Sequence, residues 1–207
     1  VELKKKTFTR RRADFERVNK LYADAFELRL AQATELEYHG VGWDDDAVQQ
    51  LCSALQDSTS ALQRLNLTWN SFGARGAVVL AETVKASVVL SVLDIHRNWI
   101  GDVGAAALAE ALRSHCSLQT LGLQLCGVGA QGAIALGAAL ESNRSLQTLD
   151  LSFNLIGQRG AVAFAEIITK NSALGTLDLV GNHIPRSAEL ALREAAQARA
   201  TPVKLSV

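Results

Sequence analysis

A fifteen-residue pattern recurs along most of the chain. Residues 146–160 read LQTLDLSFNLIGQRG, and their large aliphatic positions return at a constant spacing of 28 residues, in most copies with the asparagine and the final glycine. The copies begin at Leu62, Leu90, Leu118, Leu146 and Leu174. A constant period of this length indicates a solenoid, in which each unit buries its apolar face only against its neighbours.

Each unit predicts a short strand followed by a helix. The Leu-x-Leu alternation turns two side chains to one face of a strand, and parallel strands of successive units stack about 4.8 Å apart. The asparagine that follows can donate to and accept from backbone groups that the turn leaves without partners. Cys126 replaces it in the middle unit. Glycines open the helices where a side chain would collide with the preceding turn: Gly76, Gly104, Gly132 and Gly160.

Helices are wider than strands, so a stack of such units must bend with the strands inside. The expected fold is therefore an α/β right-handed solenoid, a horseshoe with parallel strands on its concave face and helices on its convex face.

The repeat divides the chain into three parts. Residues 1–32 do not match it and predict a basic arm followed by a helix, which we interpret as a cap on the end of the array, with a partner-docking helix as the alternative. Residues 33–199 form the array, with one degraded unit and five units of 28 residues. Residues 200–207 are left as a C-terminal tail. Ser187 is expected to cap the last helix.

Charge is balanced over the chain but not along it. Lys plus Arg and Asp plus Glu number 21 each, so the whole chain lacks a nucleic-acid signature. Residues 1–12 carry six basic side chains and one acidic one, a local charge of +5, and the other residues therefore sum to −5. We expect this arm to attach to an acidic protein, RNA or a membrane surface, the alternative being a disordered tail.

The cysteines indicate the redox state of the cellular compartment, and the apolar runs indicate whether the chain could span a membrane. Cys52, Cys116 and Cys126 lack the short spacing of a metal or redox site, so they are interpreted as free thiols in a reducing, cytoplasmic compartment. No apolar run approaches the roughly 20 residues needed to span a membrane.

The unit Leu-x-x-Leu-x-Leu-x-x-Asn/Cys-x-Ile-Gly-x-x-Gly-Ala resembles the leucine-rich repeats of the ribonuclease-inhibitor type. That type also occurs in NOD-like receptors, tropomodulins and the Ran GTPase-activating protein. The resemblance covers residues 33–199 and implies a protein-binding horseshoe. It does not identify the partner, because relatives share the scaffold and differ in what they bind.

Two motifs are typical of enzymes but have simpler interpretations. Gly127, Gly129 and Gly132 spell the G-x-G-x-x-G of a dinucleotide site, yet they fall on the turn of the repeat itself. Asp94, Asp150 and Asp178 recur between strand leucines, but Gly122 interrupts their column, and a solvated concave face is the favoured interpretation. We expect no catalytic, cofactor-binding or metal-binding residues and no cofactor.

The residues predicted to bind a partner lie on the outward positions of the strands. Three outward columns are small and polar, whereas the column at the strand exits carries large apolar and guanidinium groups of the kind enriched at interface hot spots. The predicted protein-binding residues are Trp69, Arg97, Trp99, Leu125, Phe153, His96, Asp94 and Asp150. The alternative is that the rings pack on their own turns.

We therefore expect a non-enzymatic protein-interaction or scaffold protein that uses its concave face and strand exits, with protein partners and no small-molecule substrate. Apolar residues expected on the convex face suggest a subunit of a larger assembly, associated with the cytoskeleton or another complex, unless the helix phase is misassigned: Val78, Val79, Ile134, Val162 and Ile167. The competing interpretations are a GTPase-activating or other regulatory protein and the sensing array of a NOD-like receptor.

Overall fold

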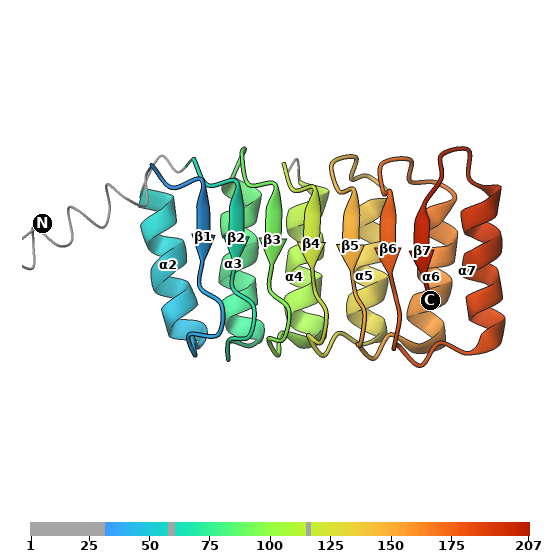
Figure 1. The fold of residues 1–207 in the computed structure, drawn as a ribbon, viewed down its shortest axis with the longest axis horizontal. Coiled ribbons are helices and arrows are strands. Elements are labelled where there is room, and N and C mark those ends of the chain that lie inside the picture. The colour runs from blue at the N-terminus through green and yellow to red at the C-terminus, as the bar shows by residue number, and fades with distance from the viewer. Residues whose placement is uncertain (1–31, 58–60, 115–116) are drawn as a thin grey trace, which may run out of the picture.

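The computed structural model describes residues 32–57, 61–114 and 117–207, in which strands and helices alternate (Figure 1). The strands are β1 (Glu35–Glu37), β2 (Arg64–Asn66), β3 (Val92–Asp94), β4 (Thr120–Gly122), β5 (Thr148–Asp150), β6 (Thr176–Asp178) and β7 (Lys204–Ser206). The helices are α2 (Asp45–Asp57), α3 (Ala74–Ala86), α4 (Gly101–Arg113), α5 (Ala130–Leu140), α6 (Gly157–Ile168) and α7 (Arg186–Ala198). The expected basic arm and capping helix lie outside the described residues.

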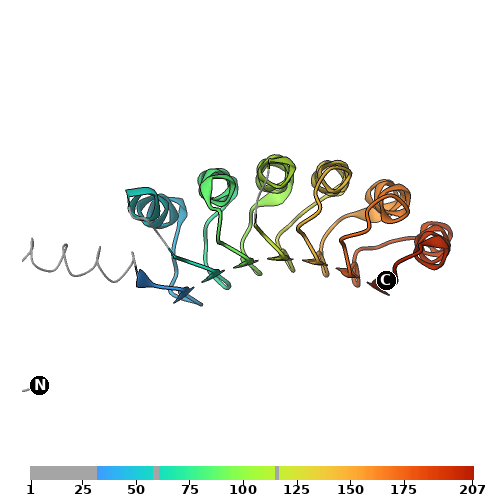
Figure 2. The same cartoon turned by 90° about the horizontal axis from the view of Figure 1, so that it is seen from above.

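The strands form one parallel sheet in chain order from β1 to β7. Their register advances by one repeat per strand, so the central residues pair in a single row: Leu36, Leu65, Leu93, Leu121, Leu149, Leu177 and Leu205. Figure 2 shows the strands on the concave side of a curved array and the helices on its convex side. The α/β solenoid predicted from the repeat is confirmed.

One continuous core runs between the sheet and the helices. Leu65 in β2 and Leu67, directly after it, are fully buried, and they belong to the same cluster as the helix residues Leu80 and Leu108. Burying one leucine side chain contributes about 1.5–3 kcal/mol, so the repeated leucines are the main source of stability.

The asparagines that follow β2, β3, β5 and β6 link neighbouring repeats. Asn154 Nδ2 donates to the carbonyl oxygen of Leu151 at 2.9 Å and to that of Leu123, one repeat earlier, at 2.8 Å. Its Oδ1 accepts the backbone N–H groups of Cys126 and Val128 at 3.0 and 2.9 Å. The equivalent carbonyl positions accept from the amides of Asn70, Asn98 and Asn182.

Cys126 occupies the asparagine position in the middle repeat, as the sequence predicted. Its Sγ donates to the carbonyl oxygen of Ile95 at 3.3 Å. Burial raises the pKa of Cys126 to about 12, so the thiol keeps the proton that this hydrogen bond needs at neutral pH. Cys52 is likewise a buried free thiol, whereas Cys116 lies outside the described part of the chain.

The glycines that open the helices leave room for the preceding repeat. A Cβ on Gly132 would lie 2.9 Å from Cγ1 of Val128, in its own turn, and 2.8 Å from Cβ of Ala105, in the preceding helix. A Cβ on Gly104 would likewise approach Cβ of Ala77 to 2.8 Å. The expected collision with the turn is confirmed, and the helix-to-helix contact is an additional constraint.

An aspartate in one repeat caps the helix of the next. Asp102 Oδ1 accepts the backbone N–H groups of Gly129 at 2.7 Å and Gly132 at 2.9 Å, and Asp45 forms the equivalent pair of bonds with α3. These N–H groups are the ones that hold a phosphate when a helix start binds a nucleotide. The G-x-G-x-x-G motif therefore serves the contact between repeats, as its position on the repeat turn indicated.

The last repeat departs from the sequence interpretation in two places. Residues 200–207, set aside as a tail, supply β7, whose Leu205 continues the central row. Pro202 stands where other units begin with leucine, so the pattern is interrupted in the sequence before the fold ends. The expected cap by Ser187 is wrong, because the N-cap residue of α7 is Pro185 and Ser187 lies inside the first turn of the helix.

The convex face carries one apolar column. Val78 and Val162 are each 40% exposed, Val79 and Ile134 are half-buried, and Ile167 is buried. The expectation of a solvent-facing position is therefore wrong for Ile167, whose phase on the helix turns it toward the core. The column contains one residue from each helix from α3 to α7 inclusive: Val78, Ala106, Ile134, Val162 and Leu190.

Replacing Gly132 by alanine is expected to lower the free energy of unfolding by about 1–3 kcal/mol, because the new Cβ overlaps Ala105 and Val128. Gly137, in the same helix, is the matched control, since a Cβ there would meet nothing closer than 3.8 Å. Alanine at Gly137 should stabilise the protein by up to about 1 kcal/mol. Urea denaturation measures both effects, and equal stabilities of the two variants would contradict this account of the glycines.

Candidate functional site

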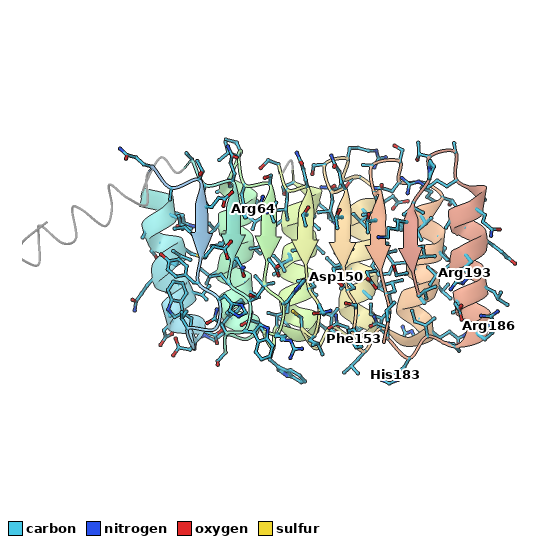
Figure 3. The ribbon with its side chains drawn as sticks, viewed as in Figure 1. Arg64, Asp150, Phe153, His183, Arg186 and Arg193 are labelled. Carbon is cyan, nitrogen blue, oxygen red and sulfur yellow. The ribbon has the colours of Figure 1, made fainter. Side chains whose placement is uncertain are left out.

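The outward side chains of the strands form columns along the concave face. We call the column at the third position of each strand the acidic column: Glu37, Asn66, Asp94, Gly122, Asp150, Asp178 and Ser206. Figure 3 shows Asp150 in the middle of the sheet and Arg64 nearer to the strand starts. Arg64 forms an ion pair with Glu35 at 3.4 Å, so one of the concave cations is already engaged by a carboxylate.

Side chains of the acidic column also shape the strand exits. Oδ1 of Asp94, Asp150 and Asp178 accepts the backbone N–H two residues later, at 3.2, 2.8 and 3.0 Å. Asn66 forms the same bond at 3.0 Å. These are Asx turns, which bend the chain out of the strand. The recurrence of aspartate at this position therefore has a structural cause, whatever the column binds.

His96 lies between two carboxylates of the acidic column. Its Nδ1 is 3.3 Å from Asp94 Oδ1, and its Nε2 is 3.6 Å from Asp150 Oδ2. Gly122 provides the space, because a Cβ there would collide with Nε2. Partial burial raises the pKa of Asp94, an effect that His96 opposes and the Asp150 carboxylate reinforces. The structure thus joins three predicted binding residues, and the gap at Gly122 is filled by the imidazole ring.

A second column stands at the strand exits, where the backbone adopts a left-handed conformation. The φ angle is 57° at Trp69, 58° at Arg97, 55° at Leu125 and 56° at Phe153. A residue with a Cβ costs about 1–2 kcal/mol in this conformation, which glycine adopts freely. Gly181 occupies the equivalent position in the last repeat, with φ 73°. Four successive repeats therefore place a large side chain where the turn favours glycine.

Of these large side chains, Trp69, Arg97 and Phe153 are exposed, and Leu125 is half-buried. Trp69 is 54% exposed and Phe153 is 51% exposed. Trp99, two residues after Arg97, is 75% exposed, and Leu155, two repeats further on, is 59% exposed. Figure 3 shows Phe153 at the edge of the sheet where the strands end. We call this group the strand-exit ridge: Trp69, Arg97, Trp99, Leu125, Phe153 and Leu155.

The N-terminal end of the ridge is a stack of side chains from successive repeats. Cζ of Arg97 lies 4.0 Å from the ring centroid of Trp69, which is a cation–π contact. His39, in the preceding repeat, meets Trp69 edge-on, with 6.3 Å between the two ring centroids. This contact fixes the orientation of the guanidinium above the indole and still leaves half of Trp69 exposed.

Glycines in the next repeat support the other rings. A Cβ on Gly127 would lie 3.5 Å from the indole of Trp99, and one on Gly181 would lie 2.7 Å from the ring of Phe153. Each ring therefore rests partly on its neighbour. The alternative expectation, that the rings pack on their own turns, accounts for only part of their surface, because half or more remains exposed.

The sequence interpretation missed three residues of this edge. Leu155 joins the ridge, Val41 is 54% exposed near its N-terminal end, and His183 lies beyond its C-terminal end with φ 53° (Figure 3). A signal for Leu155 was present, because it follows Trp99 by two full repeats. The left-handed backbone at His183 has no signal in the residue type.

Hollows lie at both edges of the described surface. One of about 420 Å³ opens at the strand-start edge beside Leu62, Val88 and Leu90. Another, of about 200 Å³, lies beside Gly181 and His183. Among the described residues, no group of three or more His, Cys, Asp or Glu side chains is placed to hold a metal ion. No helix in this part of the chain is long and apolar enough to cross a membrane.

Comparison with known families now identifies the repeats. Residues 61–81, 87–109, 114–137 and 142–165 match the family described as Leucine Rich repeat. The chain is a leucine-rich repeat protein. The resemblance drawn from the sequence is thus confirmed for the repeat family. The ribonuclease-inhibitor type agrees with the full helix of 11 to 13 residues in each described repeat and stays an interpretation.

One solved structure similar to this leucine-rich repeat protein is the leiomodin-1 actin-binding site 2. Its TM-score is 0.56 at 16% sequence identity, over 84% of this chain and 87% of that chain. Identity this low shows the shared fold alone. No curated protein sequence matches the chain.

Variants of Arg97 separate backbone strain from side-chain contact. Arg97→Ala and Arg97→Gly both lose the cation–π contact, but only glycine relieves the left-handed φ. We expect the glycine variant to be more stable than the alanine variant by about 1 kcal/mol. The same pair at Arg64, in a strand, is the control, and there alanine should be the more stable. Chemical denaturation measures all four, and the same order at both positions would show that the turn is not strained.

Proposed function

We propose that this leucine-rich repeat protein is a non-enzymatic interaction module that captures a partner protein with the strand-exit ridge and the adjoining concave face. The leucine-rich repeats and the likeness to an actin-binding domain support a protein-interaction role. The proposed contact residues are those predicted from the sequence: Trp69, Arg97, Trp99, Leu125, Phe153, His96, Asp94 and Asp150.

The exposed rings in left-handed turns are the observation that carries this proposal. Trp69 and Phe153 combine an unfavourable backbone conformation with more than half of a large apolar side chain in water. Folding does not require either feature, because Gly181 forms the same turn in the last repeat. A bound partner would remove the ring surface from water, and the fixed backbone would present the rings without a further loss of conformational freedom.

The concave face adds specificity to the ridge in this proposal. Its strands offer small polar side chains and the group formed by Asp94, His96 and Asp150, in which two carboxylates flank one imidazole. Charged groups beside a hydrophobic contact favour complementary partners and exclude those of like charge.

The proposal extends to the assembly and the cellular location of the protein. We propose a subunit of a larger assembly, because the convex apolar column offers a second surface away from the ridge. A cytoplasmic location agrees with the free thiols of Cys52 and Cys126. Association with the cytoskeleton is supported by the similar solved domain, an actin-binding site by name. Actin is therefore the first candidate partner to test.

The ridge can be tested with a triple variant, Trp69→Ala, Trp99→Ala and Phe153→Ala. Hot-spot residues contribute about 2 kcal/mol or more each, so affinity should fall by at least about 30-fold. Substitutions at exposed positions change stability little, and Tm should move by less than about 5 °C. Co-sedimentation with actin filaments, and calorimetry with any partner found by crosslinking in extract, would measure the affinity.

Val88→Ala combined with Val89→Ala is the matched control for that experiment. These valines are 85% and 39% exposed and lie beside the hollow at the strand-start edge, opposite the ridge. The control should bind as the wild type does. A triple variant that binds its partner with unchanged affinity would refute the ridge as the contact surface.

A further inference from the structure

The distance between successive side chains of the ridge indicates which secondary structure of a partner could match it. Backbone N–H groups of Trp69, Arg97, Leu125 and Phe153 donate to carbonyl oxygens of the following repeat at 2.9, 2.9, 3.1 and 2.7 Å. The parallel hydrogen-bond ladder thus continues through the ridge and holds its side chains at the strand spacing of about 4.8 Å. Three steps, from Trp69 to Phe153, cover about 14 Å.

An α-helix matches this spacing better than an extended peptide does. A helix presents side chains on one face once per turn, every 5.4 Å or so, and three turns cover about 16 Å. An extended chain presents them every second residue, at about 6.7 Å, and three such steps cover about 20 Å. The accumulated mismatch is about 2 Å for the helix and about 6 Å for the strand.

The outer side of the ridge has a second spacing that a helix also fits. Trp99 and Leu155 are separated by two repeats, or about 10 Å. Residues seven apart on a helix are about 10.5 Å apart and lie on nearly the same face. A helix resting on the ridge would therefore place one pair of apolar side chains, seven residues apart, against Trp99 and Leu155.

The acidic column determines the charge of the other flank. Asp94 and Asp150 precede Arg97 and Phe153 by three residues, and because the chain turns between them they lie less than about 10 Å from the ridge backbone. A helix with side chains is about 10 Å wide, so its inner flank would lie over these carboxylates. Asp178 continues the column in the next repeat. Lysine or arginine on the inner flank would complement this charge, and glutamate there would be repelled.

We propose that the partner element is an amphipathic α-helix, apolar at positions i, i+4, i+7 and i+11, with basic residues on the flank that faces the strands. This rests on the proposed function, because it specifies what the ridge captures. The helix lies across the strand exits and runs along the array, with its apolar face on the ridge and its basic flank over the acidic column.

Unbiased selection of peptides tests the proposal directly. A phage-displayed library of random 20-residue peptides is selected on the full chain, with counter-selection on the Trp69→Ala, Trp99→Ala, Phe153→Ala variant. The enriched peptides should carry apolar residues at helical spacing with lysine or arginine on one flank. Their circular dichroism should gain helix on binding, and their affinity for the triple variant should fall at least about 30-fold.

A charge variant tests the orientation of the bound helix. Asp150→Asn with Asp178→Asn keeps the Asx-turn oxygen and removes two charges, so affinity for the enriched peptides should fall about fivefold at low salt. Glu82→Gln with Glu110→Gln, on helices α3 and α4, removes two exposed charges from the convex side and should leave affinity unchanged.

The outcomes distinguish the two levels of proposal. Enriched peptides that depend on the ridge but are extended or acidic would overturn the helix and leave the ridge as the contact surface. Peptides that bind the triple variant as well as the wild type, or a selection that enriches none, would overturn both. Equal weakening by the two charge variants would overturn the assignment of the basic flank to the acidic column.

Discussion

A strand of three residues cannot satisfy its own backbone, so every repeat depends on the next for hydrogen-bond partners. The parallel ladder supplies part of this requirement, and the asparagines after β2, β3, β5 and β6 supply more of it. Asn154 serves carbonyl and N–H groups in two repeats at once, from a buried position where an unpaired amide would be costly. One residue therefore stabilises both the local turn and the contact between repeats.

The same constraint creates the surface on which binding is proposed. To bring each asparagine into the core, the chain must turn sharply at the residue before it, and that residue takes the left-handed conformation. Its side chain then has no place in the core and projects from the edge of the sheet. Glycine would suffice, as Gly181 demonstrates, but Trp69 and Phe153 occupy the position in other repeats. The fold determines the direction of these side chains, whereas the residue type at this position can vary between repeats.

Positions that recur in every repeat could be predicted from the sequence. Contacts that a non-recurring residue makes with a neighbouring repeat could not. Leucines, asparagines and exit residues repeat every 28 positions, so strands, curvature and most of the ridge follow from spacing. The cap by Asp102 was not predicted, because its partners lie 27 and 30 residues later. The placing of His96 over Gly122 likewise depends on the absence of a side chain in the neighbouring repeat. β7 was not predicted because Pro202 stands at the position of the leucine that begins the other 28-residue units.

Buried residues determine the fold and exposed edge residues do not, so membership of the repeat family predicts the fold without predicting the partner. Stability of a solenoid is close to a sum of repeat and nearest-neighbour terms, so a change at one exposed exit does not propagate through the array. Ridge and acidic column can therefore vary in residue type while the buried row and the asparagines stay fixed. In the proposed binding mode, affinity depends on the few side chains that the turn leaves outside the core. Their order along the parallel ladder then determines the spacing that a partner must match.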